Sequence, residues 1–281
     1  MIETFQFEFM RNALLAGLLA SVVCGVIGTL IVINRLVFLS GGVAHSAYGG
    51  IGLAFYFGWP YMVGANLFAF ASAMIMAAVA LKSKQRADTI VGVMWAMGMA
   101  TGILLLDLTP GYNVDLMSYL FGSILSVPRE ELIAMAVLTM VILALIGYYY
   151  KELLLMSYDE EFALVRGVPV KALHFMLIGI VAVTVVILVK VVGLILVIAL
   201  LTIPPYIAEK YTKSMLQMMV ASTVLGMVFI CGGLWVSYVY DLTSGAVVIF
   251  VAGIGFFLSL FLDKVISIRQ RQLWLKSHGA K

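Results

Sequence analysis

Residues 172–208 read ALHFMLIGIVAVTVVILVKVVGLILVIALLTIPPYIA, an apolar run that contains a single charged side chain, Lys190. A transmembrane helix needs about 20 apolar residues to cross a hydrocarbon core about 30 Å thick. This run is too long for one such helix and just long enough for two short ones. We therefore divide it within KVVG, between Lys190 and Gly193, and predict two adjacent membrane-spanning helices.

The composition of the whole chain agrees with that interpretation. Only 11% of the 281 residues are charged and 64% are hydrophobic, whereas soluble domains carry about 25% charged residues. We predict an all-α, polytopic membrane bundle that forms one transmembrane domain over residues 1–281, with nine spans and a range of eight to ten. The predicted spans are 12–33, 37–57, 60–81, 89–106, 131–150, 172–189, 191–208, 215–238 and 243–262.

The distribution of basic residues predicts how these spans cross the membrane. With the N-terminus outside, every one of the 17 basic residues except Arg11, Arg129 and Lys190 falls in an inner segment. This is the pattern expected when cytoplasmic loops are enriched in Lys and Arg. The C-terminus, with its basic tail at 264–281, is then cytoplasmic. We expect a multi-pass protein of the cytoplasmic membrane, whose positive net charge reflects topology rather than nucleic-acid binding.

Two hydrophilic segments interrupt the spans. The outer one contains a short apolar piece, Leu116–Leu125, which is too short to span and is predicted to be a re-entrant or interfacial half-helix. The inner one reads YKELLLMSYDEEFALVRGVPVKAL at 150–173 and predicts a short helix at about 157–168. Acidic side chains at its start favour a helix N-terminus, while Gly167 and Pro169 end it. We interpret this amphipathic helix as a docking element for a partner.

The chain carries no motif for an energy source or a catalytic centre of its own. The P-loop pattern G-x-x-x-x-G-K-[ST], H-E-x-x-H, the serine nucleophile elbow and C-x-x-C are all missing from the sequence, so we predict a transport subunit that is not an enzyme. A secondary transporter would need carboxylates inside the membrane, but every Asp and Glu falls at or near the end of a predicted span. A structural membrane scaffold, assembled through the inner acidic loop, is the alternative from another class.

One ionisable residue lies deep in a predicted span, within SGGVAHSAYGG at 40–50. His45 is about nine residues from the inner end of its span, or roughly 14 Å at 1.5 Å per residue, which places it near the midplane. Imidazole is the commonest metal ligand among protein side chains, so His45 is a candidate metal contact. The alternative is a packing histidine, hydrogen-bonded to Ser40 or Ser46. The small residues around it fit both interpretations, because they allow close helix packing and also leave room along a pathway.

Four segments carry a family resemblance: LVFLSGGVAHSAYGGIGLAF, DLMSYLFGSIL, DEEFALVRGV and VVGLILVIALLTIPP, in this order. Together they resemble the permease subunits of ABC importers for zinc, manganese and iron, and the resemblance extends over about residues 10–265. It implies a homodimer in the membrane, separate ABC ATPase subunits on the cytoplasmic side, and an extracytoplasmic metal-binding protein that delivers the cargo. Membrane lipid is the surrounding partner, and no permanently bound cofactor and no nucleic acid are expected.

The resemblance also implies roles for individual residues. The short inner helix corresponds to the coupling helix of the family, which docks on the ATPase, and its residues here are Asp159, Glu160, Glu161, Phe162, Arg166 and Gly167. The metal would pass Asp115 at the outer mouth, an acid that could equally be an ordinary helix cap, and then His45. The small residues that would line the path are Gly41, Gly42, Ser46 and Gly49.

The sequence departs from the family pattern at one of these positions. Many members carry an Asp four residues before the histidine, where this chain has Gly41. Zinc accepts nitrogen and sulfur ligands, so zinc is the first choice of cargo for a site that lacks this carboxylate. Manganese, which prefers oxygen ligands, and iron are the alternatives within the family.

Overall fold

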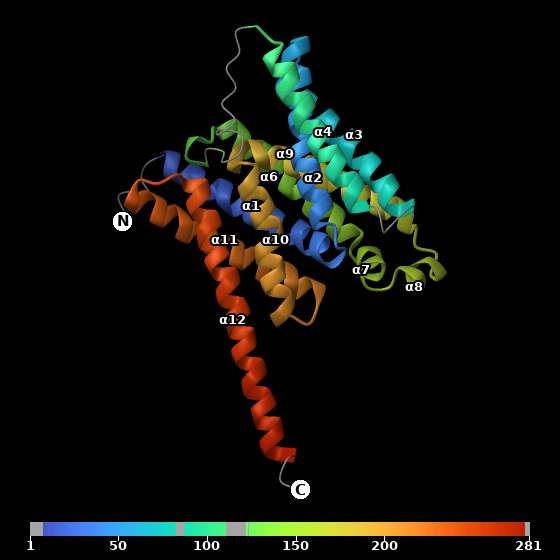
Figure 1. The fold of residues 1–281 in the computed structure, drawn as a ribbon, viewed down its shortest axis with the longest axis vertical. Helices are drawn as coiled ribbons and strands as arrows, with labels where there is room; N and C mark the ends of the chain where they lie inside the picture. Colours follow the sequence, from blue (N-terminus) through green and yellow to red (C-terminus); the bar gives the residue numbers. More distant parts are fainter. Residues whose placement is uncertain (1–7, 83–86, 111–121, 123, 279–281) are drawn as a thin grey trace.

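Apolar stretches of the chain form long helices that cross one another in a bundle (Figure 1). The computed structural model describes residues 8–82, 87–110, 122 and 124–278, and all regular structure in these ranges is helical, which confirms the all-α prediction. In chain order the elements are α1 (Glu8–Ile33), α2 (Val37–Phe57), α3 (Tyr61–Lys82), α4 (Ala87–Asp107), the 3-10 helix η2 (Ile124–Ser126), α6 (Arg129–Tyr148), α7 (Tyr150–Tyr158), α8 (Glu160–Val165), α9 (Val170–Val192), α10 (Leu194–Tyr211), α11 (Met215–Tyr240) and α12 (Ser244–His278).

Each predicted span corresponds to one long helix. Within the described ranges, eight helices are long and apolar enough to cross a membrane. The ninth, α2, is not among these eight, yet its bounds agree with the predicted span at 37–57. The long apolar run divides at Gly193, whose φ of +87° belongs to a backbone region that favours glycine. The sidedness of the helices stays a prediction.

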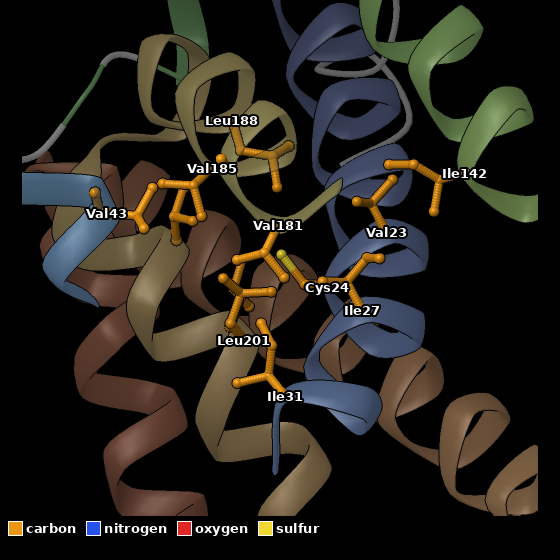
Figure 2. Packing of buried hydrophobic residues seen from close by; sticks show 14 of the residues in the cluster. Val23, Cys24, Ile27, Ile31, Val43, Ile142, Val181, Val185, Leu188 and Leu201 are labelled. Atoms are coloured by element: carbon orange, nitrogen blue, oxygen red, sulfur yellow. The ribbon is translucent and has the colours of Figure 1, made fainter. Parts of the chain in front are cut away.

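The centre of the bundle is formed by α1, α9 and α10. Figure 2 shows Cys24 and Ile27 of α1 close to Val181 of α9 and Leu201 of α10, with Val43 of α2 at the edge of the same cluster. These helices are mostly buried, whereas α4, α6 and α12 leave most of their surface exposed. The exposed helices are apolar, as expected for helices whose outer faces meet lipid.

Glycines bring α2 into close contact with α3 and α4. A Cβ atom added to Gly98 of α4 would lie 2.7 Å from the Cα of Ser46, and one added to Gly52 of α2 would lie 2.7 Å from the Cα of Gly102. Gly50 makes a similarly close approach to α3. Small residues at these contacts let helix backbones approach closely inside a membrane. The glycines therefore hold α2, α3 and α4 as one packed unit, which fixes the position of the middle of α2.

We expect Gly102→Ala to destabilise the protein by about 1–3 kcal/mol, the typical cost of overpacking a well-packed contact. The added methyl would lie 2.8 Å from the carbonyl carbon of Tyr48. Gly253→Ala in α12 is the matched control, because no described atom lies within 4 Å of its Cβ and Ala favours a helix over Gly by about 1 kcal/mol. The thermal unfolding midpoint in detergent should fall for Gly102→Ala and hold or rise for Gly253→Ala. Equal midpoints would contradict the tight α2–α4 contact.

A polar cluster joins α10 to α12, the helix that extends beyond the rest of the bundle in Figure 1. Nζ of Lys210 lies 2.6 Å from Oδ2 of Asp263 and donates to Oγ of Ser259 at 3.2 Å. The hydroxyl of Tyr211 donates to Oδ1 of the same aspartate at 2.9 Å. From Asp263 the helix continues to His278, so the basic tail predicted at 264–281 is helical over most of its length.

Candidate functional site

His45 lies on α2, on the side that packs against α4. Its imidazole stacks on the indole of Trp95, with ring centroids 4.1 Å apart and planes 13° from parallel. Phe38 approaches the same indole at a centroid distance of 6.1 Å. The imidazole is partly buried, and its Nδ1 is buried without a hydrogen-bond partner among the described residues. An unsatisfied buried nitrogen costs about 1–3 kcal/mol, a cost that a bound metal ion would remove.

Ser40 and Ser46 were the predicted hydrogen-bond partners of His45 in a packing role. Both serines instead form hydrogen bonds within α2. Oγ of Ser40 donates to the carbonyl of Val37 at 2.8 Å, and Oγ of Ser46 donates to the carbonyl of Val43 at 3.0 Å. In the described part of the chain, neither hydroxyl reaches Nδ1 of His45. A packing role for His45 therefore depends on the Trp95 stack and not on these hydrogen bonds.

The four small residues predicted to line the path have different surroundings. Gly42, Ser46 and Gly49 are buried against α3 and α4. Gly41 is also buried, but a Cβ added there would meet only Cδ1 of Ile198, at an ordinary contact distance of 3.9 Å. Gly41 is therefore the one of these four positions with room for a larger side chain. A path-lining role stays a prediction for all four.

The second predicted metal contact, Asp115, lies outside the described residues, as does most of the predicted half-helix at Leu116–Leu125. No group of three or more His, Cys, Asp or Glu side chains is placed to hold a metal ion in the part of the chain that the structure describes. Of the two predicted metal contacts, His45 is thus the one whose surroundings are known. Asp115 stays a prediction.

Two of the segments that carried the family resemblance meet in space. Gly122, from the LFG of the second segment, has φ +63°, and a Cβ added to it would lie 2.5 Å from the carbonyl carbon of Val192 and 2.8 Å from the Cα of Gly193. This backbone contact falls at the break between α9 and α10. The absence of a side chain at Gly122 is therefore needed for the approach as well as for its backbone conformation.

The short inner helix predicted from the sequence is present as α8 and is shorter than the expected range of 157–168. Oδ1 of Asp159 accepts the backbone N–H of Phe162 at 2.9 Å, which caps the helix N-terminus. At the other end Gly167 has φ +78°, and the amides of Gly167 and Val168 donate to carbonyls of the last turn, each at 3.0 Å. This is the hydrogen-bond pattern of a Schellman motif. Both ends of α8 are thus fixed by their own caps.

The outward face of α8 is apolar. Phe162, Leu164 and Val165 are 44%, 54% and 85% exposed, whereas Ala163 is fully buried and holds the helix against the bundle. The guanidinium of Arg166 lies 5.1 Å from the centroid of the Phe162 ring, and the first turn carries two glutamates. Aromatic and arginine side chains are enriched at the energetic centres of protein interfaces. The docking role of this face stays a prediction.

An ion pair that the sequence did not reveal lies beside the break between α9 and α10. Nζ of Lys190 lies 2.5 Å from Oε1 of Glu131 and 5.3 Å from the centroid of the Tyr61 ring. The contact joins the end of α9 to the beginnings of α6 and α3. These residues are far apart in the chain, so no local pattern could have paired them.

Comparisons with known proteins agree with this architecture. The ABC 3 transport family matches residues 6–263. An uncharacterized membrane protein of Synechocystis is 53% identical over 260 residues, and the manganese transport system membrane protein MntC of Listeria monocytogenes is 31% identical over 260 residues; each alignment covers 92% of both chains. Among solved structures, PsaBC from Streptococcus pneumoniae in complex with Fab contains a chain with a TM-score of 0.82 at 28% identity, covering 92% of this chain and 93% of that one. The chain therefore belongs to the ABC 3 transport family and is a multi-pass membrane permease of a metal ABC importer.

Proposed function

We propose that this permease forms a homodimeric pathway for a divalent transition metal, that the metal passes His45, and that manganese is the first candidate for the cargo. The observation that carries the proposal is the buried Nδ1 of His45, which has no partner among the described residues. Imidazole nitrogens ligate divalent transition metals, and α2 places this one about halfway along the helix.

The choice of manganese rests on the relatives. Two relatives with a stated cargo are named as manganese transport system membrane proteins. The one from Listeria monocytogenes is 31% identical to this chain, and the one from Halalkalibacterium halodurans is 28% identical. Zinc, which the sequence favoured because Gly41 replaces a carboxylate, has no specific support among these names. Zinc remains the second candidate because His45 offers a nitrogen ligand, which zinc accepts readily.

The pathway would hold its cargo only briefly. A permease must bind the ion well enough to admit it and weakly enough to release it, and a lone imidazole supplied by each protomer is a weak, incomplete ligand set. An extracytoplasmic binding protein would deliver the metal to the outer mouth. Two ATPase subunits, docked on the α8 helices at the cytoplasmic face, would supply the energy. Because α8 is capped at both ends, it can transmit a displacement without unwinding.

Uptake into proteoliposomes tests this proposal directly. The permease would be reconstituted with its ATPase subunits and its binding protein, and ATP-driven uptake of manganese and zinc would be measured separately and in competition. We expect ATP-dependent manganese uptake that zinc inhibits only weakly. Uptake of zinc with exclusion of manganese would overturn the choice of cargo. If a complex that hydrolyses ATP takes up neither metal, the proposal is overturned for manganese and for zinc. A complex without ATP is the control for leakage.

A further inference from the structure

A groove lies beside α8, between α7 and the connection that leads from α10 into α11. It has a volume of about 390 Å³, within the range of about 300–1,000 Å³ that is typical of ligand pockets. One wall is formed by α7 and the other by the residues before and at the start of α11. The lining residues are Tyr150, Leu154, Leu155, Tyr158, Asp159, Lys213, Ser214 and Met215.

The groove has apolar walls and a charged rim. Leu154 and Leu155 are partly buried in the wall and Tyr158 is exposed at its edge, so an apolar group that enters would be removed from solvent. At the opposite rim Lys213 is exposed, and none of the described acids forms an ion pair with it. An occupant that presents an apolar side chain next to a carboxylate would match both features.

The groove is continuous with the exposed face of α8. Asp159 lines the groove and also caps α8 through its bond to the amide of Phe162. Figure 1 shows α7 and α8 at the same end of the bundle, where they contact each other. A partner that covers Phe162 and Val165 would therefore reach the mouth of the groove without leaving the surface.

A groove with apolar walls next to a lysine could hold either of two classes of occupant. One is a lipid, and the other is a protein segment. An anionic lipid headgroup and a partner carboxylate would both be attracted by Lys213 and repelled by Asp159, so the position of each charge decides which of them fits. A protein segment can place its own carboxylate beside Lys213 and keep it away from Asp159. Continuity with α8 also favours the protein, since the same partner would then cover both surfaces.

We propose that this groove is a second contact for the ATPase subunit, which inserts an apolar side chain flanked by a carboxylate between α7 and Lys213. The inference rests on the proposed docking of the ATPase on α8. It adds a second contact, so that the ATPase binds the permease both at the exposed face of α8 and in the adjoining groove. An ATPase movement would then act on α11 through its first turn as well as on α9 through α8.

Photo-crosslinking in the assembled permease–ATPase complex tests the groove. Leu155 in the groove, Val165 on α8 and Phe250 on the exposed face of α12 would each be replaced by p-benzoyl-phenylalanine, and the complex would be irradiated in lipid nanodiscs. We expect crosslinks to the ATPase from positions 155 and 165 and none from position 250. One result would overturn the groove contact and leave docking on α8 intact. In it, position 165 crosslinks to the ATPase, while position 155 gives only lipid adducts or no adduct. No ATPase crosslink from either position in an active complex would overturn both.

Charge reversal at the rim gives a second measurement that leaves the apolar residues of the groove in place. Lys213→Glu should weaken binding of the purified ATPase to the permease about tenfold, because the reversal would place two carboxylates side by side across the interface and such like-charge contacts are strongly unfavourable. Lys213→Arg should bind like the parent protein. Lys264→Glu, an exposed charge reversal on α12, should also bind like the parent. Equal binding by the two Glu variants would overturn the proposed ion pair.

Discussion

His45→Ala is expected to lower ATP-driven metal uptake at least about tenfold at low external metal, because loss of even an outer-shell partner of a metal ligand costs about 10–100-fold. The imidazole is the metal-ligating group that the described structure places in the middle of α2, and its Nδ1 has no partner there. The measurement is the initial rate of uptake in proteoliposomes at metal concentrations below saturation. Expression and ATPase binding should be unchanged, because α8 packs mainly against α7 and α9, and His45 lies on α2.

Two further substitutions separate a metal contact from a packing group. His45→Phe keeps a ring that can stack on Trp95, whose centroid lies 4.1 Å from that of the imidazole, but it removes both nitrogens. His45→Gln keeps hydrogen-bonding capacity and is a much poorer metal ligand. If His45 binds the cargo, both variants should transport like His45→Ala. Parent-like uptake by His45→Phe would show that the ring acts through stacking alone, and parent-like uptake by His45→Gln would show that it acts as a hydrogen-bonding group.

The position one turn before the histidine extends this test. An Asp at residue 41 would lie on the same helix face as His45, because residues four apart are neighbours on a helix. The structure has room for it, since the nearest atom to a Cβ at Gly41 is 3.9 Å away. Gly41→Asp should tighten metal binding, and it should lower turnover if release of the cargo becomes limiting. Tighter binding that depends on His45 would place both residues at one site.

Local sequence signals predicted the parts of the structure that depend on local physics. The bounds of α2 followed from apolar length. The division of the long run at Gly193 followed from apolar length and a glycine, and the caps of α8 from Asp159 and Gly167. Each of these features is decided by residues within a few positions of one another, so a single sequence is enough to find them.

Contacts between distant helices could not be predicted in this way. The stacking of His45 on Trp95 and the ion pair between Lys210 and Asp263 join residues about 50 positions apart in the chain. The small residues of α2 illustrate the limit. Their sequence pattern fitted a path wall and a packing surface equally. Only the packing of the helices distinguishes Gly41, which is buried but has room beside it, from Gly42 and Gly49, which are in tight contact with α3 and α4.

Phe162→Ala is expected to weaken binding of the ATPase by about 30-fold, which corresponds to the roughly 2 kcal/mol that defines an interface hot spot. The ring is 44% exposed on the outward face of α8 and carries the Arg166 guanidinium 5.1 Å from its centroid. The loss should appear in a binding assay with purified subunits, while membrane insertion is retained. Phe250→Ala is the matched control, because this Phe is 72% exposed on α12, away from α8.

The shape of α8 should matter as much as its side chains, and the cap residue tests this. Asp159→Ala removes the bond to the amide of Phe162 and should cost the helix about 1 kcal/mol, whereas Asp159→Asn keeps a good cap and removes the charge. If docking needs a preformed helix, Asp159→Ala should lower both ATPase binding and metal-stimulated ATP hydrolysis, and Asp159→Asn should retain them. Equal loss in both variants would assign the effect to the carboxylate charge. A double variant, Glu161→Lys with Phe162→Ala, that binds the ATPase as tightly as the parent would show that α8 is not the docking element.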